Sequence, residues 1–569
     1  MTSEKTNITE EPLWFGAPDR PVFGFLTRPS AGPLRGAVII APPVGYEARN
    51  AKRSLRELCR TLAQSGFATL RFDYRGTGDS SGAFGSSMPT PNWIDDILSG
   101  AQFLREAGFD VICLVGMRLG ATMAAHAAWS TATPFQSVVF WDPCESGRRY
   151  LRENRALESL RREHFSDRDD GSIETTEYLF SAEMVASLRE LTMEPPDECG
   201  RSTRFLVITR ETQSLSTSTM AKFAALNTSF RKTTEQEDLL QSLPYYARVP
   251  FETIFHIVQW LEEGAVPRDI RVHPVITPEA SLPVGSSGKV IERAEFLGLR
   301  RNFAVLTEPV SSPRGPWIVM LPNVHEDHNG PSRMWVDLAR HWALSGIRSV
   351  RFDPSGIGDS PRTSNEEALT SLDGQWITEV VDACAALSPS TPDNVVLIGM
   401  CSGATLAIEA ARRLRSRGLC ALNPPIGINV LHSLSQMQTS RSSVLLFLGR
   451  RLRSVYASHP WIVTTVWEAI RLMRPRRWCR DIIAKIQGRG TKVLVLRSVD
   501  EFSEFSSIPL MRSLDGRHRD ASLPYPSVIV EGLDHGFTID DGRRRAAEQI
   551  SDFVLSHFAS GTVAPSPRN

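Results

Sequence analysis

The sequence predicts two tandem α/β domains, each a mostly parallel sheet that is flanked by helices and carries a cap segment. One observation behind this is an internal repeat whose two copies lie about 280 residues apart. The other is that short apolar runs alternate with amphipathic helical patterns within each copy, which is typical of a parallel sheet covered on both faces. The length agrees, because 569 residues exceed what one hydrophobic core usually organises.

Two motifs define the repeat. Residues 71–80 (RFDYRGTGDS) recur as residues 351–360 (RFDPSGIGDS), and residues 116–122 (GMRLGAT) recur as residues 399–405 (GMCSGAT). Because both motifs recur at nearly the same offset, they indicate a tandem duplication.

The elements of the two copies follow the same order along the chain. We expect strands at 36–40, 68–72, 137–141 and 204–209 in the first copy, and at 317–321, 348–352, 394–398, 419–422, 492–496 and 526–530 in the second. We expect helices at 54–63 and 333–343, a closing helix at 542–558, and the last strand and helix of the first copy between 240 and 260. The resulting boundaries are a first domain at 10–265, a linker at 266–288, a second domain at 289–560 and a tail at 561–569.

The composition is that of a soluble globular protein, with 41% hydrophobic residues, 22% charged residues and a net charge of zero. A neutral chain has no global field that attracts nucleic acid or a membrane. The N-terminus lacks the pattern of a signal peptide, and no apolar run is long enough to span a bilayer. Eight scattered cysteines without a C-x-x-C pair are typical of reduced thiols. These observations predict a cytoplasmic protein.

The most informative stretch is the turn Gly399-Met400-Cys401-Ser402-Gly403, which lies between an apolar run and a helical pattern. A strand, a Gly-x-Nuc-x-Gly turn and a helix form the nucleophile elbow of the α/β-hydrolase fold. The central residue is Cys401, which we interpret as a thiol nucleophile. The alternatives are that Cys401 is an inert buried thiol, or that Ser402 is the nucleophile although it stands one place off the centre.

A thiol nucleophile needs a base and a third group that orients the base. The chain order of this fold is nucleophile, acid, histidine. Asp500 follows the expected strand at 492–496, with Glu504 as its rival, and His535 follows the strand at 526–530. We therefore predict a Cys401, Asp500 and His535 triad, while His535 as a structural loop residue remains the alternative.

The oxyanion hole of this fold uses the backbone N–H after the nucleophile and another from the loop after the first strand of the parallel sheet. These requirements point to Ser402 and to Asn323 or Val324. The same loop contains His325, Glu326, Asp327 and His328, which we interpret as solvated residues rather than a metal site. The glycine turns at 76–78 and 356–358 are too short for a dinucleotide fingerprint, so no cofactor is expected.

The first copy lacks this chemistry. Its elbow centre is Arg118, and a guanidinium stays protonated and cannot attack a carbonyl. The copy offers only His256, in the middle of a helical pattern, as a base. We therefore expect a non-catalytic domain. Arg118 either pairs with a neighbouring carboxylate or binds a carboxylate or phosphate of a ligand.

These motifs resemble those of bacterial α/β-hydrolase-like proteins of the serine aminopeptidase and exosortase-associated type. In the first copy the resemblance lies in GMRLGAT at 116–122, PPxGYEA at 42–48, RFDY at 71–74 and WDP at 141–143. In the second copy it lies in the G-x-C-S-G-A elbow, RFDPSGIGDS and the G-x-D-H at 532–535. The resemblance covers nearly all of both halves. It implies an α/β-hydrolase fold twice and a triad on Cys401, Asp500 and His535. The chain departs from these relatives at Pro322-Asn323-Val324, where they usually carry N-A-G.

The second cap is strongly basic. Between residues 441 and 489 there are ten arginines and Lys485 against Glu468 and Asp481. The arginines are at 441, 450, 451, 453, 471, 474, 476, 477, 480 and 489. A solvated face is one interpretation; an acyl carrier protein, CoA or, less favoured, a membrane surface is the other. Nucleic acid is not expected.

A thiol facing an apolar, basic cap suits acyl transfer from a thioester. The predicted function is therefore a cysteine-dependent acyl hydrolase or acyltransferase that acts on an ester or thioester. The alternative from another class is a non-catalytic tandem scaffold that binds a ligand or protein through both pockets.

Overall fold

The computed structural model divides the chain into two compact units, Met1–Ala294 (unit 1) and Glu295–Asn569 (unit 2). The residues that it describes are 8–83, 85, 89–161, 168–176, 178–196, 202–240, 247–324, 326–361, 374–424, 477–498 and 525–559. Within these residues each unit has a large sheet of its own, and each sheet has apolar side chains packed against both faces.

The large sheet of unit 1 has the strand order β1-β2-β4-β3-β5-β6-β9-β10. Its strands are β1 (Ile8–Phe15), β2 (Val22–Pro29), β3 (Gly36–Ala41), β4 (Phe67–Phe72), β5 (Ile112–Met117), β6 (Ser137–Trp141), β9 (Arg204–Arg210) and β10 (Thr228–Thr233). The strands from β4 to β10 run parallel, whereas β1 and β2 are antiparallel to their neighbours. A small separate ribbon consists of β7 (Ile173–Glu174) and β8 (Leu179–Phe180).

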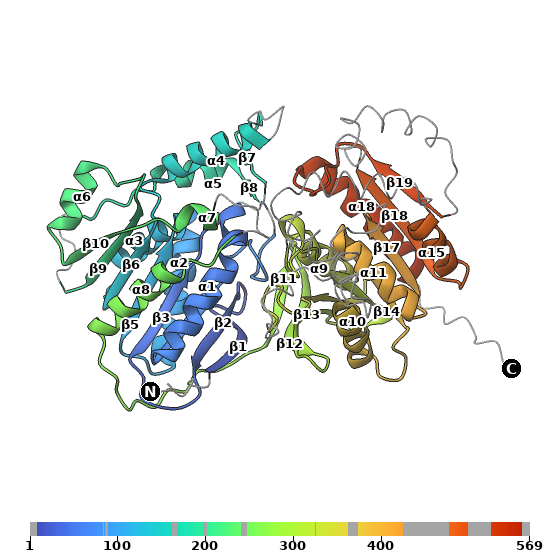
Figure 1. Ribbon diagram of the computed structural model, residues 1–569, viewed down its shortest axis with the longest axis horizontal. Helices are drawn as coiled ribbons and strands as arrows, with labels where there is room; N and C mark the ends of the chain where they lie inside the picture. The colour runs from blue at the N-terminus through green and yellow to red at the C-terminus, as the bar shows by residue number, and fades with distance from the viewer. Residues whose placement is uncertain are drawn as a thin grey trace, which may run out of the picture. The chain divides into compact units, whose positions relative to one another are not determined.

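Helices cover both faces of this sheet (Figure 1). The helices of unit 1 are α1 (Tyr46–Gln64), α2 (Thr90–Glu106), α3 (Leu119–Ser130), α4 (Gly147–Arg161), α5 (Ala182–Glu190), α6 (Thr217–Ala224), α7 (Gln236–Leu240) and α8 (Phe251–Gly264). Side chains of α1 and α8 share one apolar cluster with the sheet, and those of α2 and α3 share the other. This double cover explains why the central strands are apolar throughout.

The second large sheet repeats the plan, with the order β11-β12-β13-β15-β14-β16-β17-β18-β19; the strands from β13 onward along the chain belong to unit 2. Its strands are β11 (Glu279–Val284), β12 (Gly288–Leu297), β13 (Asn302–Pro309), β14 (Arg314–Leu321), β15 (Ile347–Phe352), β16 (Val395–Met400), β17 (Gly418–Leu422), β18 (Lys492–Ser498) and β19 (Ser527–Val530). The strands from β15 to β19 are parallel. Its helices are η2 (Pro331–Arg333), α9 (Met334–Leu344), α10 (Gly374–Leu387), α11 (Ser402–Arg413), α15 (Arg477–Gln487) and α18 (Asp540–Phe558).

The expected fold class is confirmed, because both sheets are mostly parallel and flanked by helices. The expected strand before the elbow of unit 2, at 394–398, corresponds to β16, and the closing helix begins two residues early, at Asp540. One element was misplaced. The eight-stranded sheet ends with β10, and the described residues 247–250, where a last strand was expected, form no strand. The sequence did not indicate β10 because it is an edge strand whose Ser229, Phe230, Arg231 and Lys232 are exposed and carry no apolar pattern.

The segment 266–288, which the sequence predicts to be a linker, contains β11, and the division between the two units falls within β12. Both strands are antiparallel additions with mixed burial. None of the described helices combines the length and the apolar character needed to cross a membrane.

Candidate active site

The elbow of unit 2 has the backbone strain expected of a nucleophile turn. Cys401 lies between β16 and α11 with φ 51° and ψ −116°, a backbone conformation that residues other than glycine rarely adopt. A Cβ added to Gly399 would overlap the backbone of Gly403, and one added to Gly403 would lie 2.5 Å from the carbonyl oxygen of Pro322. Both glycines are therefore required by the tightness of the turn.

The elbow of unit 1 has the same shape without the nucleophile. Arg118 lies between β5 and α3 with φ 54° and ψ −122°, close to the values at Cys401. Gly116 and Gly120 are again too close to neighbouring backbone to carry a side chain. The duplication has therefore kept the strained turn in a unit whose central residue cannot attack a carbonyl.

Of the six cysteines whose side chains the structure describes, Cys401 is the one that is partly exposed. The others are buried: Cys59, Cys113, Cys144, Cys384 and Cys420. Burial raises the pKa of Cys59 to about 11 and that of Cys113 and Cys384 to about 12. Cys401 instead caps the N-terminus of α11, where the helix dipole favours a negative charge. Its position, and not its residue type, distinguishes it from the buried thiols.

Parallel strands bring the predicted site to one edge of the sheet. Cys401 follows β16, Asn423 follows β17 and His535 follows β19, and these strands run in the same direction. His535 is exposed in a turn before α18. Asp500 and its rival Glu504 lie outside the described residues, so the acid stays a prediction.

Asn423 connects the loops that carry these groups. Its side chain is fully buried, and its φ is 43°. The Asn423 Oδ1 accepts a hydrogen bond from the Ser498 N–H at 2.7 Å, and its Nδ2 donates to the His535 carbonyl at 3.1 Å. The preceding residue, Leu422, accepts from the Cys401 N–H at 2.8 Å. One short segment after β17 thus holds the backbone of Cys401, the end of β18 and the backbone of His535.

The histidine turn has its own internal restraint. The Asp534 carboxylate accepts hydrogen bonds from the Ile539 N–H at 3.0 Å and the Thr538 hydroxyl at 2.9 Å. The neighbouring Asp534 therefore supports the turn that leads into α18. Together with Asn423, it fixes the backbone on both sides of His535.

The predicted oxyanion residues meet, but with a feature that the sequence does not show. The Val324 N–H donates to the Ser402 Oγ at 3.0 Å. Ser402 is buried, and its own N–H is at the first position of α11, where no intrahelical carbonyl can accept it. The Asn323 carbonyl accepts a long hydrogen bond of 3.4 Å from the Glu326 N–H. The Val324 N–H, one of the two predicted oxyanion donors, is therefore already hydrogen-bonded to the Ser402 hydroxyl in this structure.

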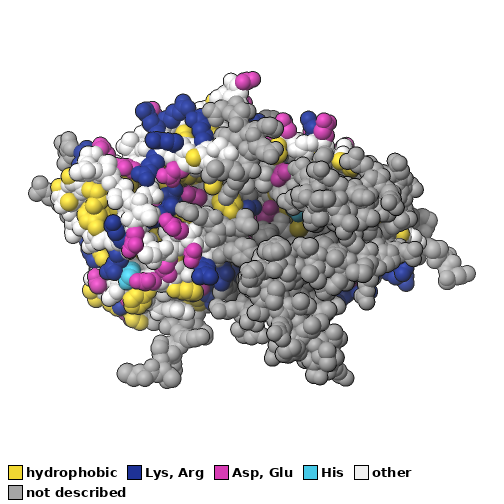
Figure 2. Space-filling view, turned by 45° about the horizontal axis from the view of Figure 1, so that its top comes forward, with side chains coloured by type: hydrophobic (Ala, Val, Ile, Leu, Met, Phe, Trp, Pro, Cys, Tyr) yellow, Lys and Arg dark blue, Asp and Glu magenta, His cyan; other side chains and the backbone are white. Residues whose placement is uncertain are grey.

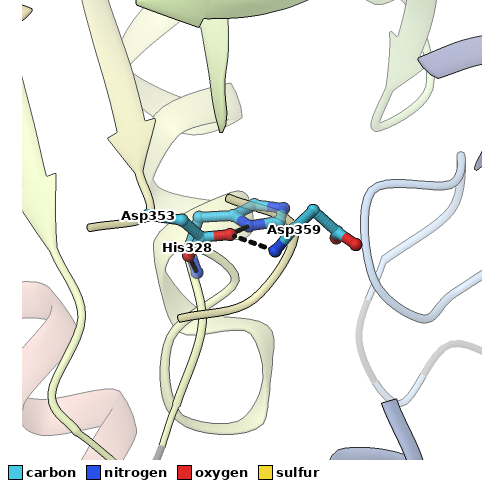
Figure 3. A group of neighbouring side chains, drawn as sticks. All are labelled: His328, Asp353 and Asp359. Carbon is cyan, nitrogen blue, oxygen red and sulfur yellow. Dashed lines mark hydrogen bonds and ion pairs between the residues drawn. The ribbon is translucent and has the colours of Figure 1, made fainter. Parts of the chain in front are cut away.

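The interpretation of His328 as a solvated loop residue was wrong. His328 is fully buried, and its Nδ1 lies 2.7 Å from the Asp353 Oδ2 (Figure 3). The His328 N–H also donates to Asp353, at 2.7 Å. The reason is that the loop folds back over the start of the 353–360 turn, which the local sequence does not reveal. His325 lies outside the described residues.

His328, Asp353 and Asp359 form a group whose potential metal-binding atoms lie within 4.8 Å of one another. Figure 3 shows that Asp359 presents its backbone nitrogen to Asp353, at 3.0 Å. In unit 1 the equivalent Asp73 accepts from the Asp79 N–H at 3.1 Å with no histidine bonded to it among the described residues. The aspartate therefore secures the turn in both copies, and the hydrogen bonds account for the cluster without an ion.

Arg118 is surrounded by carboxylates. Its Nε donates to Glu47 at 2.8 Å, one terminal nitrogen donates to Glu153 at 2.6 Å, and the other contacts Asp142 at 3.4 Å. Arg210 pairs with Asp142 at 2.8 Å from the other side. Burial raises the pKa of Glu47, whereas Arg118 and Arg149 lower that of Glu153. The guanidinium is thus engaged on all three nitrogens by side chains of its own unit.

Unit 1 has no histidine at the place of His535 among its described residues. The segment after β10 begins α7 with Gln236, which is fully buried and accepts a hydrogen bond from the Trp141 indole at 2.9 Å. His256 lies in α8 and is half-buried. Both the nucleophile and the base positions of this copy are therefore filled by residues with structural contacts.

Comparisons with known proteins agree with this fold. A family model described as serine aminopeptidase, S33, matches residues 32–165, which lie in unit 1 and include Arg118. No curated protein matches the chain.

Several solved structures are similar to a part of the chain. Est1E from Butyrivibrio proteoclasticus is 14% identical, covering 45% of this chain and 98% of its own, with a TM-score of 0.34. A soluble variant of monoglyceride lipase from Saccharomyces cerevisiae is 10% identical, covering 46% of this chain and 99% of its own, with a TM-score of 0.35. A bacterial brefeldin A esterase is 15% identical, covering 46% of this chain and 79% of its own, with a TM-score of 0.32.

The strand order and the two strained elbows make the chain an α/β-hydrolase-like protein, and the family match, which covers residues 32–165, agrees with this fold. The family match lies in the unit whose elbow carries Arg118. The predicted nucleophile Cys401 and the predicted base His535 lie in the other unit.

Proposed function

We propose that unit 2 is a cysteine-dependent acyl hydrolase or acyltransferase, and that unit 1 is a non-catalytic copy of the same fold. The observation that carries the proposal is the strained elbow at Cys401, whose thiol is partly exposed at the N-terminus of α11. The hydrogen bonds of Asn423 support it, because they tie the His535 turn to the strand ends beside the elbow.

In the proposed reaction His535 accepts the Cys401 proton, and the sulfur attacks the carbonyl carbon of an ester or thioester. The tetrahedral intermediate collapses to an acyl-cysteine when its bond to the leaving group breaks, and His535 returns the proton to that group. Water, an alcohol or an amine, deprotonated by His535, then attacks the acyl-cysteine. The bond between the acyl carbon and the Cys401 sulfur breaks, the product leaves, and His535 returns the proton to the sulfur. Asp500 or Glu504 would orient the imidazole.

The developing oxyanion would be stabilised by the Ser402 N–H and the Val324 N–H. Because the Val324 N–H donates to the Ser402 Oγ in this structure, the hydroxyl has to rotate away for both donors to act. Removing the hydroxyl in Ser402→Ala would free the Val324 donor without changing the elbow backbone.

The proposed substrate is an acyl thioester or a small-molecule ester. Exchange of an acyl group between two thiols is nearly isoenergetic, which favours thioesters. An acyl carrier protein or CoA at the basic segment 441–489 remains a prediction, because only residues 477–489 of this segment are described. The cytoplasmic location also remains a prediction.

Intact-protein mass spectrometry tests the proposal. Wild type and Cys401→Ala are incubated with a panel of acyl-CoA thioesters and p-nitrophenyl esters, and Cys384→Ala serves as the control that removes a buried thiol. We expect an acyl adduct and turnover that depend on Cys401 and survive in the control. The absence of any Cys401-dependent adduct and of turnover across both panels would favour a tandem binding scaffold instead.

A further inference from the structure

Unit 1 carries a pocket on its surface that the reaction does not use. It lies where α4 contacts α5 and has a volume of about 370 Å³. We call it the α4–α5 arginine pocket, and its lining residues are Arg148, Leu151, Arg152, Arg155 and Arg189. In Figure 2, Lys and Arg side chains gather at the top of the view, where this part of unit 1 comes forward. Four of the five lining residues are thus permanent cations.

Two of these cations have no partner among the residues that the structure describes. Arg152 and Arg189 are exposed, and neither side chain makes an ion pair or hydrogen bond in the described part of the protein. Arg148 has one carboxylate nearby, since it lies 3.5 Å from Glu190, in a pair in which both side chains are mostly exposed. Such an exposed pair neutralises little of the local charge. This contrasts with Arg118, which is engaged by three carboxylates.

The spacing of the arginines along α4 brings like charges close together, where they repel. Arg148 and Arg152 are four residues apart on α4, and Arg155 follows three residues later, so their side chains share one face of the helix. Like charges at these spacings repel each other and destabilise a helix. A bound anion would remove this repulsion.

The framework of the pocket is fixed. The Arg148 Nε donates to the Arg189 carbonyl at 2.9 Å and thereby joins the start of α4 to the end of α5. The Ser181 side chain caps α5 by accepting a hydrogen bond from the Met184 N–H at 3.2 Å. Leu151 of α4 is buried. The guanidinium groups therefore extend from a backbone that does not need to rearrange on binding.

We propose that the α4–α5 arginine pocket binds a small molecule through a phosphoryl or pyrophosphoryl group. Guanidinium forks match phosphate oxygens in pairs, and several forks around one pocket suit an anion with two or more negative charges. No aromatic side chain lines the pocket among the described residues, so the recognised feature is the phosphate and not a stacked base. The site is independent of Cys401 and of the proposed reaction.

Isothermal titration of the full chain with inorganic pyrophosphate tests this site. The variant is Arg152→Gln/Arg189→Gln, which removes two exposed cations without touching the Arg148 hydrogen bond. The matched control is Arg231→Gln/Lys232→Gln on β10, which removes the same charge from exposed positions of the same unit. We expect the pocket variant to weaken pyrophosphate binding by about tenfold or more, since charged forks are lost, and the control to have little effect.

A third variant, Arg152→Lys/Arg189→Lys, keeps the positive charge but removes the planar guanidinium group. We expect its affinity for pyrophosphate to lie between those of wild type and the glutamine variant. A second arm replaces pyrophosphate by vesicles that contain phosphatidic acid, which distinguishes a free phosphorylated molecule from a lipid headgroup. Equal weakening in the pocket variant and the β10 control would overturn the proposal, because it would show a general charge effect. The proposal would also be overturned if wild type did not bind pyrophosphate, or if it bound only the vesicles.

Discussion

At the scale of single residues, the centre of the elbow decides what each unit can do. Cys401 and Arg118 occupy nearly the same backbone conformation, with φ of 51° and 54°. The turn directs both side chains from the end of a central strand. The thiol is left partly exposed, whereas the guanidinium is buried among carboxylates. One difference in residue type at a nearly unchanged turn therefore separates a partly exposed thiol from a buried ion-pair network.

Removing Arg118 should destabilise unit 1 strongly. Arg118→Ala leaves the mostly buried Glu47 carboxylate without the guanidinium that it contacts, and breaking a buried ion pair costs about 3–5 kcal/mol. Arg149→Ala is the control, because Arg149 is half-exposed and its loss should cost about 1 kcal/mol or less. Urea unfolding measures both. Equal, small effects would contradict the view that Arg118 holds the unit together.

The residue after β17 shows the same divergence. Asn423 offers an acceptor to Ser498 and a donor to His535, whereas the equivalent Asp142 of unit 1 offers only acceptors, to Arg118 and Arg210. The amide therefore suits a unit that has to hold a histidine turn, and the carboxylate suits one that neutralises arginines. Asn423 is a positioning residue under the proposed function.

Asn423→Asp should lower activity without removing a reacting group. The carboxylate keeps the acceptor for Ser498 but repels the His535 carbonyl, so the turn shifts. We expect kcat to fall on the order of ten- to a hundredfold with a smaller change in KM, because misplacing a catalytic group slows the chemical step. Alkylation of Cys401 should continue. A variant with unchanged kcat and pH profile would show that Asn423 supports only the fold.

At the scale of elements, a carboxylate on a helix binds the backbone of the turn after one parallel strand in both units. The turn follows β4 and the helix is α2 in unit 1, and the turn follows β15 and the helix is α10 in unit 2. In unit 1 the Asp96 of α2 accepts from the Arg75 N–H at 3.0 Å and from its side chain at 2.5 Å. In unit 2 the Glu379 of α10 accepts from the Ser355 N–H at 2.9 Å. The contact survives different residue types because it satisfies the same buried backbone group.

This contact predicts a pH dependence for unit 1. Burial raises the pKa of Asp96 from 3.8 to about 6, although Arg75 opposes the change. Between these pH values the folded unit binds the proton and the unfolded chain does not, so the stabilisation by this group is present at low pH and is lost as the pH rises through about 6. The shift corresponds to about 3 kcal/mol.

Asp96→Asn removes this titration. We expect the free energy of unfolding of wild type, relative to Asp96→Asn, to decrease as the pH rises from about 4 to about 6 and then to level off. Chemical denaturation at several pH values measures the difference. A difference that increases with pH would mean that the ion pair with Arg75 outweighs the cost of burying the carboxylate.

At the scale of the whole molecule, each unit has its own pair of apolar clusters. Those of unit 1 lie between residues 13 and 265, and those of unit 2 between residues 297 and 558. Because the buried apolar residues that stabilise each fold belong to that unit, damage to one core should leave the other folded.

Arg118→Ala tests this separation. We expect it to increase the proteolysis of unit 1 while the rate of alkylation at Cys401 in unit 2 stays that of wild type. Limited proteolysis with mass spectrometry reads out the first effect, and iodoacetamide labelling reads out the second. A parallel change in Cys401 labelling would show that the two units unfold together.

Much of the fold could be predicted because its signals are local. The run at 395–400 is apolar because the strand is covered on both faces, and Gly399 is required by backbone contacts within the turn. The polar edge strand β10 could not be found, because an exposed strand lacks that pattern. The antiparallel β11 was missed in a segment rich in proline.

The sequence by itself determined the duplication, the two elbows and the identity of their central residues, since each follows from a few adjacent positions. Only the tertiary structure decided how those residues are used. Glu47 and Glu153 reach Arg118 from 71 and 35 positions away, and Asn423 reaches His535 across 112 positions. Contacts of this kind depend on how strands and helices pack, which no local pattern encodes. The same holds for the buried His328, whose partner Asp353 lies 25 positions further along the chain.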